Sequence, residues 1–248
     1  MNYNDNNPMS YSTRESAVSY DAGLRSYMLS VYNYMGSALA LTGIMAYLAA
    51  HYAPLTAAIY NMNPEHPGLT GLGYIIAFAP LVFVLIMSFG LNSLSFVALQ
   101  GMFWAFAAVM GLSLSSLFFA YTGASIVRVF FITSILFGSM SMWGYATKKD
   151  LTSMGHFMMM GLFGIIIASV INLFLQSNGL QFIVSILGVV IFTGLTAYDT
   201  QKIKAFYYQT SGDAVAAGKS AIMGALTLYL DFINLFIMLL RFFGDRRN

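Results

Sequence analysis

Two aspartates stand inside long apolar stretches near the C-terminal end of the sequence. Asp199 lies in GLTAYDTQKIK, and Asp231 lies in LTLYLDFINLF. A carboxylate at the centre of a membrane-spanning helix costs roughly 2.5–3.5 kcal/mol on insertion scales, so each aspartate needs a partner or a task. The pair is therefore the candidate functional site.

Each aspartate has polar neighbours at helical spacing. These neighbours are Thr196 beside Asp199, and Thr227 and Asn234 beside Asp231. Residues three or four apart share one face of a helix, so both faces are expected to point into a helix bundle. If the two helices are antiparallel neighbours, the carboxyl groups can meet.

Two carboxyl groups that meet in a low dielectric cannot both ionise cheaply, so one of them would hold a proton. Such a pair shares a hydrogen bond at lower pH and separates when both groups are charged, which makes a pH-dependent latch. Carboxylate oxygens also suit calcium, so Asp199 and Asp231 are candidate ligands for a transiently bound calcium ion. A simpler interpretation exists for Asp199, which could reach interfacial water or pair with Lys202.

Composition identifies the solvent of this chain as a lipid bilayer. The sequence is 58% hydrophobic and 8% charged, whereas a soluble domain carries about a quarter charged residues. The net charge of +2 comes without a basic run, so nucleic acid is not expected as a partner. There is no cysteine, and the three histidines, His51, His66 and His156, are dispersed. We expect no cofactor and no tightly held metal.

Seven segments have the roughly 20 apolar residues that a spanning helix needs. They are residues 26–50, 73–92, 95–119, 124–146, 155–176, 180–203 and 219–241. We therefore predict an all-α membrane protein, a bundle of seven transmembrane helices. Residues 1–23 are polar and are expected to form an N-terminal tail, which leaves residues 24–248 as one membrane domain.

The distribution of Lys and Arg favours an N-terminus inside the cell, since cytoplasmic loops are enriched in these residues. The inner set would be Arg14, Arg25, Lys148, Lys149, Lys202, Lys204 and Lys219. The outer set would be Arg128, Arg241, Arg246 and Arg247. Seven spans thus leave the basic C-terminal segment RFFGDRRN outside, and an alternative with six spans would return it to the cytoplasm.

Around the aspartates the sequence closely resembles the Bax inhibitor-1 family, specifically its bacterial members. The matching stretches are GVVIFTGLTAYDTQKIK from residue 188, LYLDFINLFIMLLRFFG from residue 228, ALTG at 40–43, WGYATKKDLTSMG at 143–155 and MGLFGIIIASVINLF from residue 160. The resemblance covers roughly residues 25–244.

This resemblance implies a seven-helix bundle with the last helix central, located in the inner membrane of a bacterium. It also implies a pH-sensitive calcium leak controlled by Asp199 of the Tyr198–Asp199 pair and by Asp231. Some relatives hold the aspartates closed with an arginine in the second helix, but residues 73–92 contain no Lys or Arg. Ser88 or Asn92 are the alternative latch donors.

Two other functions fit the same residues. One is a non-transporting membrane protein that modulates a protease or a stress response through protein partners, with contacts carried by the polar tail. The other is an intramembrane aspartyl protease, in which two carboxylates would activate water. The second aspartate lacks the Gly-x-Gly-Asp turn of such enzymes, so we do not expect an enzyme.

Overall fold

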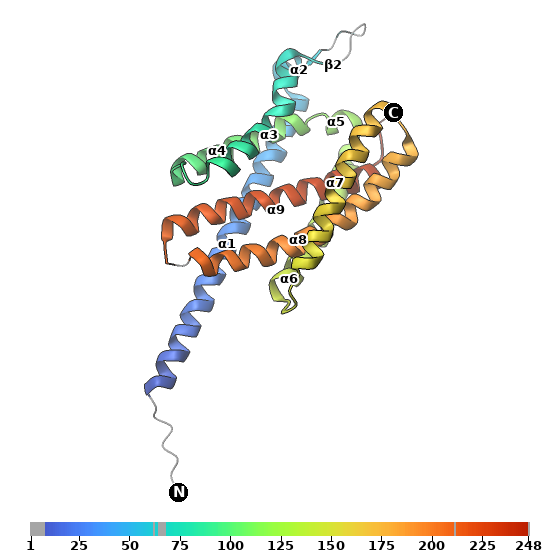
Figure 1. The fold of residues 1–248 in the computed structure, drawn as a ribbon. Coiled ribbons are helices and arrows are strands. Elements are labelled where there is room, and N and C mark those ends of the chain that lie inside the picture. The colour runs from blue at the N-terminus through green and yellow to red at the C-terminus, as the bar shows by residue number, and fades with distance from the viewer. Residues whose placement is uncertain (1–7, 62, 64–67, 211, 248) are drawn as a thin grey trace.

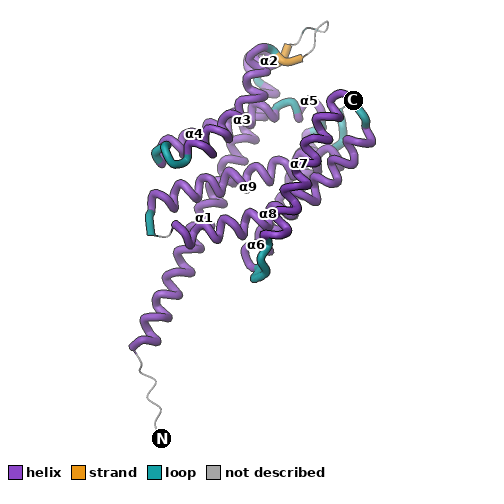
Figure 2. The backbone as a smooth tube through the Cα atoms, viewed as in Figure 1, coloured by secondary structure: helices purple, strands orange, loops and turns teal. Residues whose placement is uncertain are grey.

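The computed structural model describes residues 8–61, 63, 68–210 and 212–247, and for residues 8–21 it describes the backbone alone. These residues are helical apart from short connections and one small antiparallel β-ladder (Figure 2). The helices are α1 (Pro8–His51), α2 (Ala53–Ile59), α3 (Gly71–Gly90), α4 (Phe96–Leu114), α5 (Leu117–Ala120), α6 (Gly123–Ala146), α7 (Thr152–Leu175), α8 (Asn178–Thr210) and α9 (Ala214–Phe243). The strands are β1 (Tyr60–Asn61) and β2 (Gly68–Leu69).

The prediction of an all-α multi-pass membrane protein is confirmed. Among the described residues, six helical segments are long and apolar enough to cross a bilayer, with α4 and α5 counted together. The pair α1–α2, bent by 91°, makes a seventh if the two helices are counted as one span. Most helix ends lie within three residues of the predicted bounds, but α8 continues to Thr210 rather than ending at residue 203, α9 begins at Ala214 rather than at residue 219, and α1 begins before residue 26.

Four of these helices begin at a polar capping residue. Thr70, Ser95, Thr122 and Asp213 accept hydrogen bonds from backbone N–H groups in the first turns of α3, α4, α6 and α9. The first N–H groups of a helix have no partner within the helix, so a side-chain oxygen at this position stabilises its start.

The last helix is central in the bundle, as predicted (Figure 1). Helix α9 packs against α8, α1, α6 and α4, whereas α3 is held mainly by α4, and α7 mainly by α8. Of the most apolar part of α9, 67% of the residues are buried, compared with 6% for α7. The outer helices instead expose large apolar side chains such as Phe89 (86% exposed) and Phe174 (85% exposed), which suits contact with lipid.

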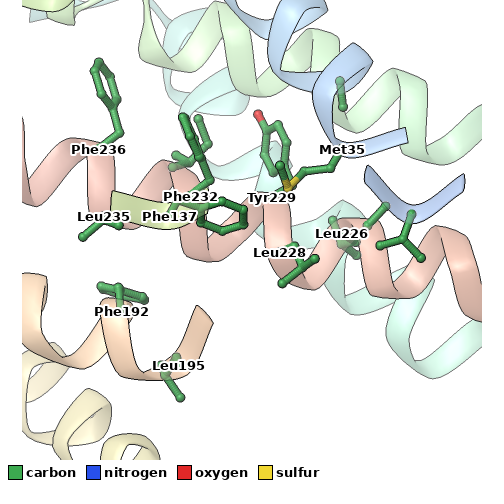
Figure 3. Close-up of a cluster of buried hydrophobic side chains, with 14 of the residues drawn as sticks. Met35, Phe137, Phe192, Leu195, Leu226, Leu228, Tyr229, Phe232, Leu235 and Phe236 are labelled. Atoms are coloured by element: carbon green, nitrogen blue, oxygen red, sulfur yellow. The ribbon is translucent and has the colours of Figure 1, made fainter. Parts of the chain in front are cut away.

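Aromatic side chains fill the centre of the bundle around α9 (Figure 3). The ring of Phe232 meets Phe137 of α6 edge-on, with 5.4 Å between ring centroids. The ring of Tyr229 meets Phe106 of α4 in the same way at 5.2 Å. Edge-to-face pairs of this kind add to the stabilisation from burial.

Successive long helices alternate in direction, so the start of α1 and the end of α9 lie at opposite ends of the bundle (Figure 1). We call the end with the α6–α7 and α8–α9 connections the inner end, and the end with the α5–α6 connection and the C-terminus the outer end. Helix α1 begins at Pro8, within the segment predicted as a polar tail, while residues 1–7 lie outside the described residues. The division at residue 24 stays a prediction.

Candidate functional site: a buried aspartate pair beside a cavity

The two aspartates that the sequence singled out are brought together between α8 and α9. Asp199 is 9% exposed and Asp231 is 5% exposed. Their carboxyl groups lie within hydrogen-bonding reach of each other. Because a carboxylate can only accept, a hydrogen bond between the two groups requires a proton on one of them.

One oxygen of this pair is both fully buried and without a hydrogen-bond partner among the described residues. It is Oδ2 of Asp231. An unpaired carboxylate oxygen in apolar surroundings is costly, and a proton or a cation would relieve that cost. Asp231, the more buried of the two aspartates, therefore has the higher free-energy cost when it is ionised.

The polar neighbours of the aspartates bond to their own helices. The hydroxyls of Thr196 and Thr227 and the amide of Asn234 each donate to the carbonyl oxygen four residues earlier, at 2.7, 3.1 and 2.8 Å. A hydroxyl has one proton, so neither threonine has one left for an aspartate. Their role as polar residues that support the aspartates stays a prediction.

A cavity of about 580 Å³ at the inner end reaches Asp199. It lies between α8, α9 and the segment that follows α3, and Asp199 lines it whereas Asp231 does not. Its other charged lining residues are Lys202, Asp213 and Lys219. Asp199 thus stands between the cavity and the buried carboxyl of Asp231.

Of the simpler interpretations of Asp199, contact with interfacial water stays a prediction, and Lys202 acts on Asp199 through its charge without forming a salt bridge to it in the described residues. The Nζ of Lys202 lies 5.9 Å from the ring centroids of both Tyr198 and Phe206. Within the described part of the chain, the one salt bridge joins Arg128 and Asp245. Asp199 also lies well before the end of α8, because this helix continues to Thr210.

Lys219, to which the sequence assigned no role beyond its positive charge, contacts the residue that follows α3. The Nζ of Lys219 in α9 donates to the carbonyl oxygen of Leu91 at 3.3 Å. Of the two alternative latch donors, Asn92 lines the same cavity as Asp199, while Ser88 is exposed and does not line it. No sequence signal linked Lys219 to Leu91, since they are far apart in the chain.

The residues around Asp199 fix this part of α8 against two neighbouring helices. The ring of Tyr198 lies directly over Gly155 of α7, where a Cβ would overlap it. On the other side, Thr200 accepts a hydrogen bond from Ser141 of α6 at 2.8 Å, because its own proton goes to the carbonyl of Thr196. The next member of this hydroxyl chain is Tyr32 of α1, 2.6 Å from Ser141.

The following residues bind the connection between α6 and α7. The amide of Gln201 donates to the carbonyl of Lys149 at 2.8 Å and accepts from the N–H of Leu151 at 2.9 Å. The Nζ of Lys204 donates to the carbonyl of Tyr145 at 3.0 Å. The residues of the YDTQKIK stretch therefore contact α6, α7 and the connection between them. These contacts fix the position of Asp199.

The site offers few ligands to a cation. Among the described residues, no three His, Cys, Asp or Glu side chains come together in a way that could hold a metal ion. Calcium prefers six to eight oxygen ligands, so a pair of carboxylates would hold it weakly. The aspartate pair can exchange a proton, and it can attract a cation at the edge of the cavity.

The family model described as "Inhibitor of apoptosis-promoting Bax1" matches residues 24–248. An uncharacterized protein of Rickettsia prowazekii, RP147, is 50% identical over 236 residues, which cover 95% of this chain and 96% of that protein. The inner membrane protein YbhL of Escherichia coli K12 is 43% identical over 94% of this chain and 97% of its own length. A protein of Caulobacter vibrioides is 42% identical over 93% of both chains. These similarities extend over the whole bundle, including the helices that carry the aspartates, and the chain belongs to the Bax inhibitor-1 family of membrane proteins.

Proposed function

We propose that this protein is a pH-sensitive leak channel for cations, with calcium as the main ion, gated by Asp199 and Asp231. The observation that carries the proposal is the meeting of two buried carboxyl groups beside a cavity at the inner end. At lower pH the pair shares a proton and its hydrogen bond holds α8 and α9 together. At higher pH both groups are charged and repel each other, which separates the helices.

The scarcity of ligands supports passage of an ion rather than storage. A conducting site must attract the ion and then release it, and two carboxylates that no third acidic side chain joins in a metal-binding cluster, within the described residues, suit that requirement. The unpaired Oδ2 of Asp231 supplies the attraction in the low-dielectric part of the path. No step of this proposal is enzymatic, and it assigns no cofactor.

The family relationship supports a location in the inner membrane of a bacterium, as the name of the Escherichia coli relative states for that protein. In this location a leak would lower the calcium gradient across the cell membrane. Binding to membrane-protein partners through the N-terminal tail remains compatible with a leak, since residues 1–23 are remote in sequence from the aspartates.

Calcium flux into liposomes that contain the purified protein tests the proposal. Flux is measured with a trapped calcium indicator over a series of pH values, for the wild type and for Asp231→Asn. We expect wild-type flux to rise with pH and the flux of Asp231→Asn to be independent of pH. Equal pH profiles for the two proteins would refute gating by the pair.

Asp150→Asn is the matched control at the same end of the protein. This exposed aspartate lies in the α6–α7 connection, where the hydroxyl and N–H of Thr152 donate to it at 2.6 and 2.9 Å. These hydrogen bonds hold the pKa of Asp150 below its ordinary value of 3.8, so its charge does not change between pH 5 and 8. Asp150→Asn should therefore show the same dependence of calcium flux on pH as the wild type.

A further inference from the structure

The basic C-terminal segment, which contains Arg241, Arg246 and Arg247, lies at the outer end. The positive-inside rule does not explain this position, because it places Lys and Arg in the cytoplasm. The backbone of the segment is fixed against the α5–α6 connection. Arg246 forms a β-bridge with Tyr121, and the N–H of Arg247 donates to the carbonyl of Ala120 at 3.0 Å. The arginines of this segment are therefore held at defined positions on the bundle.

Two small cavities at the outer end lie against these arginines. Their volumes are about 280 and 170 Å³, and Gln181 and Arg241 line both of them. The other polar residues that line them are Ser169, Asn172, Asn178, Ser185 and Arg246. No Asp or Glu is among the lining residues, so this surface has guanidinium, amide and hydroxyl groups and a net positive charge.

The two lining arginines have no acidic partner in the described part of the chain. The acid of the C-terminal segment, Asp245, is bound at 3.0 Å by Arg128, which does not line either cavity. Arg128 also donates to the carbonyl of Phe243 at the end of α9. Within residues 22–247 as described, no acidic side chain neutralises Arg241 or Arg246.

The helix dipole adds to this positive charge. Helix α8 begins at Asn178, which lines the larger cavity, and the N-terminal end of a helix carries a partial positive charge. Guanidinium groups beside a helix N-terminus match a phosphate group, because both present N–H donors to its oxygens. The chemistry of the surface is that of a phosphate site.

Apolar side chains continue from the cavities into the lipid-facing surface. Leu173 and Phe182 line the cavities and are themselves 73% and 53% exposed, and Phe174 beside them is 85% exposed. A ligand that fills the cavities and covers this surface must have a charged head and an apolar tail. A free phosphate would leave the apolar part uncovered.

We propose that the outer ends of α7, α8 and α9 bind the phosphodiester headgroup of an anionic phospholipid, with Arg241 and Arg246 on the phosphate and Gln181 between the two cavities. Basic pockets between transmembrane helices are suited to such headgroups. The ligand also accounts for the outer position of the basic segment, since it neutralises the charge that the positive-inside rule would place in the cytoplasm.

Lipid retention by the full-length protein, measured by native mass spectrometry, tests this assignment. Dioleoylphosphatidylglycerol and dioleoylphosphatidylcholine are titrated separately into protein in a neutral detergent. The wild type should retain phosphatidylglycerol at about tenfold lower concentration, because both lipids carry a phosphate but the choline cation of phosphatidylcholine is repelled by Arg241 and Arg246. The double variant Arg241→Gln, Arg246→Gln should retain both lipids equally.

Arg247→Gln is the matched control, because Arg247 lies in the same segment but does not line either cavity. It should keep the wild-type preference, and a loss as large as in the double variant would overturn the assignment. Displacement of bound phosphatidylglycerol by excess inorganic phosphate would also overturn it, by identifying a site for free anions. If the double variant does not elute as a monodisperse protein, Gln181→Ala tests the same cavities without removing charge.

Discussion

The hydroxyl of Tyr229 in α9 donates a buried 2.7 Å hydrogen bond to Thr42 of α1. The direction follows from the next contact, in which the single hydroxyl proton of Thr42 goes to the carbonyl oxygen of Ala107 in α4, at 2.8 Å. Three helices are thus joined by two hydrogen bonds at a point where water does not reach. Tyr229 lies two residues before Asp231, so these two hydrogen bonds fix the turn of α9 that carries Asp231.

Tyr229→Phe should lower stability while leaving the packing of the ring intact. Hydrogen bonds between membrane helices contribute about 0.6 kcal/mol on average and up to about 1.7 kcal/mol, and the loss is expected within this range. Unfolding by a titration with sodium dodecyl sulfate measures it. Tyr74→Phe, at a side chain that is 56% exposed, should change little, and equal losses would contradict the assignment.

Gly155→Ala should destabilise the protein because its Cβ would overlap the ring of Tyr198. Overpacking of this kind costs about 1–3 kcal/mol. Gly164→Ala is the control in the same helix, since a Cβ there meets nothing within 4 Å. Both changes carry the same gain in helix propensity, so the difference between their unfolding midpoints isolates the contact. A midpoint for Gly155→Ala at or above that of Gly164→Ala would show that α7 and Tyr198 can move apart freely.

The spans and the aspartates could be predicted because each rests on a strong local signal. Apolar length defined the helices, and a charge within such a stretch identified Asp199 and Asp231. Their meeting required only that α8 and α9 be antiparallel neighbours. The prediction of helix ends was weaker because α8 extends past the apolar stretch into the polar sequence up to Thr210.

The contacts that hold the site could not be predicted because they join residues that are distant in sequence and ordinary in type. Lys219 bonds to a backbone carbonyl at Leu91, and any residue has such a carbonyl. Gln201 binds the backbone of the α6–α7 connection in the same way. Cavities also depend on three-dimensional packing, so neither the inner cavity nor the outer pair left a pattern in the chain.

Gln201→Ala should release the connection between α6 and α7. The amide of Gln201 is bonded to the backbone on both sides of Asp150, so its loss frees the segment that contains Lys148 and Lys149. Trypsin should then cut this segment faster than in the wild type. Gln209→Ala, on the same helix, should be cut at the wild-type rate; an unchanged rate in Gln201→Ala would mean that the connection is held by other contacts.

Lys202→Met should increase cation flux if ions pass through the inner cavity. Its ammonium group repels cations beside Asp199, and a nearby unit charge in a water-filled cavity is worth on the order of 1 kcal/mol, or about fivefold in rate. Lys204→Met is the control, because Lys204 is bonded to the carbonyl of Tyr145 and does not line the cavity. Equal flux in both variants would place the ion path elsewhere.

Fusions to the C-terminus should report the outer side of the membrane. Seven crossings place the two ends of the chain on opposite sides, and the Lys and Arg distribution places the N-terminus inside. In Escherichia coli, a C-terminal alkaline phosphatase fusion should be active and a green fluorescent protein fusion dark. A fluorescent fusion would instead indicate six crossings.

The central position of α9 has a consequence for biosynthesis. This helix of 30 residues follows α1, α4, α6 and α8 in the chain, so the helices that surround it are synthesised before their common neighbour. Until α9 arrives, Thr42 and the inward faces of α1, α4, α6 and α8 are open to lipid or to membrane proteases. A chain that ends before Ala214 would lack the element that joins these helices. Assembly of the bundle is therefore completed only when α9 has entered the membrane, so a chain truncated before this helix exposes surfaces that the intact bundle buries.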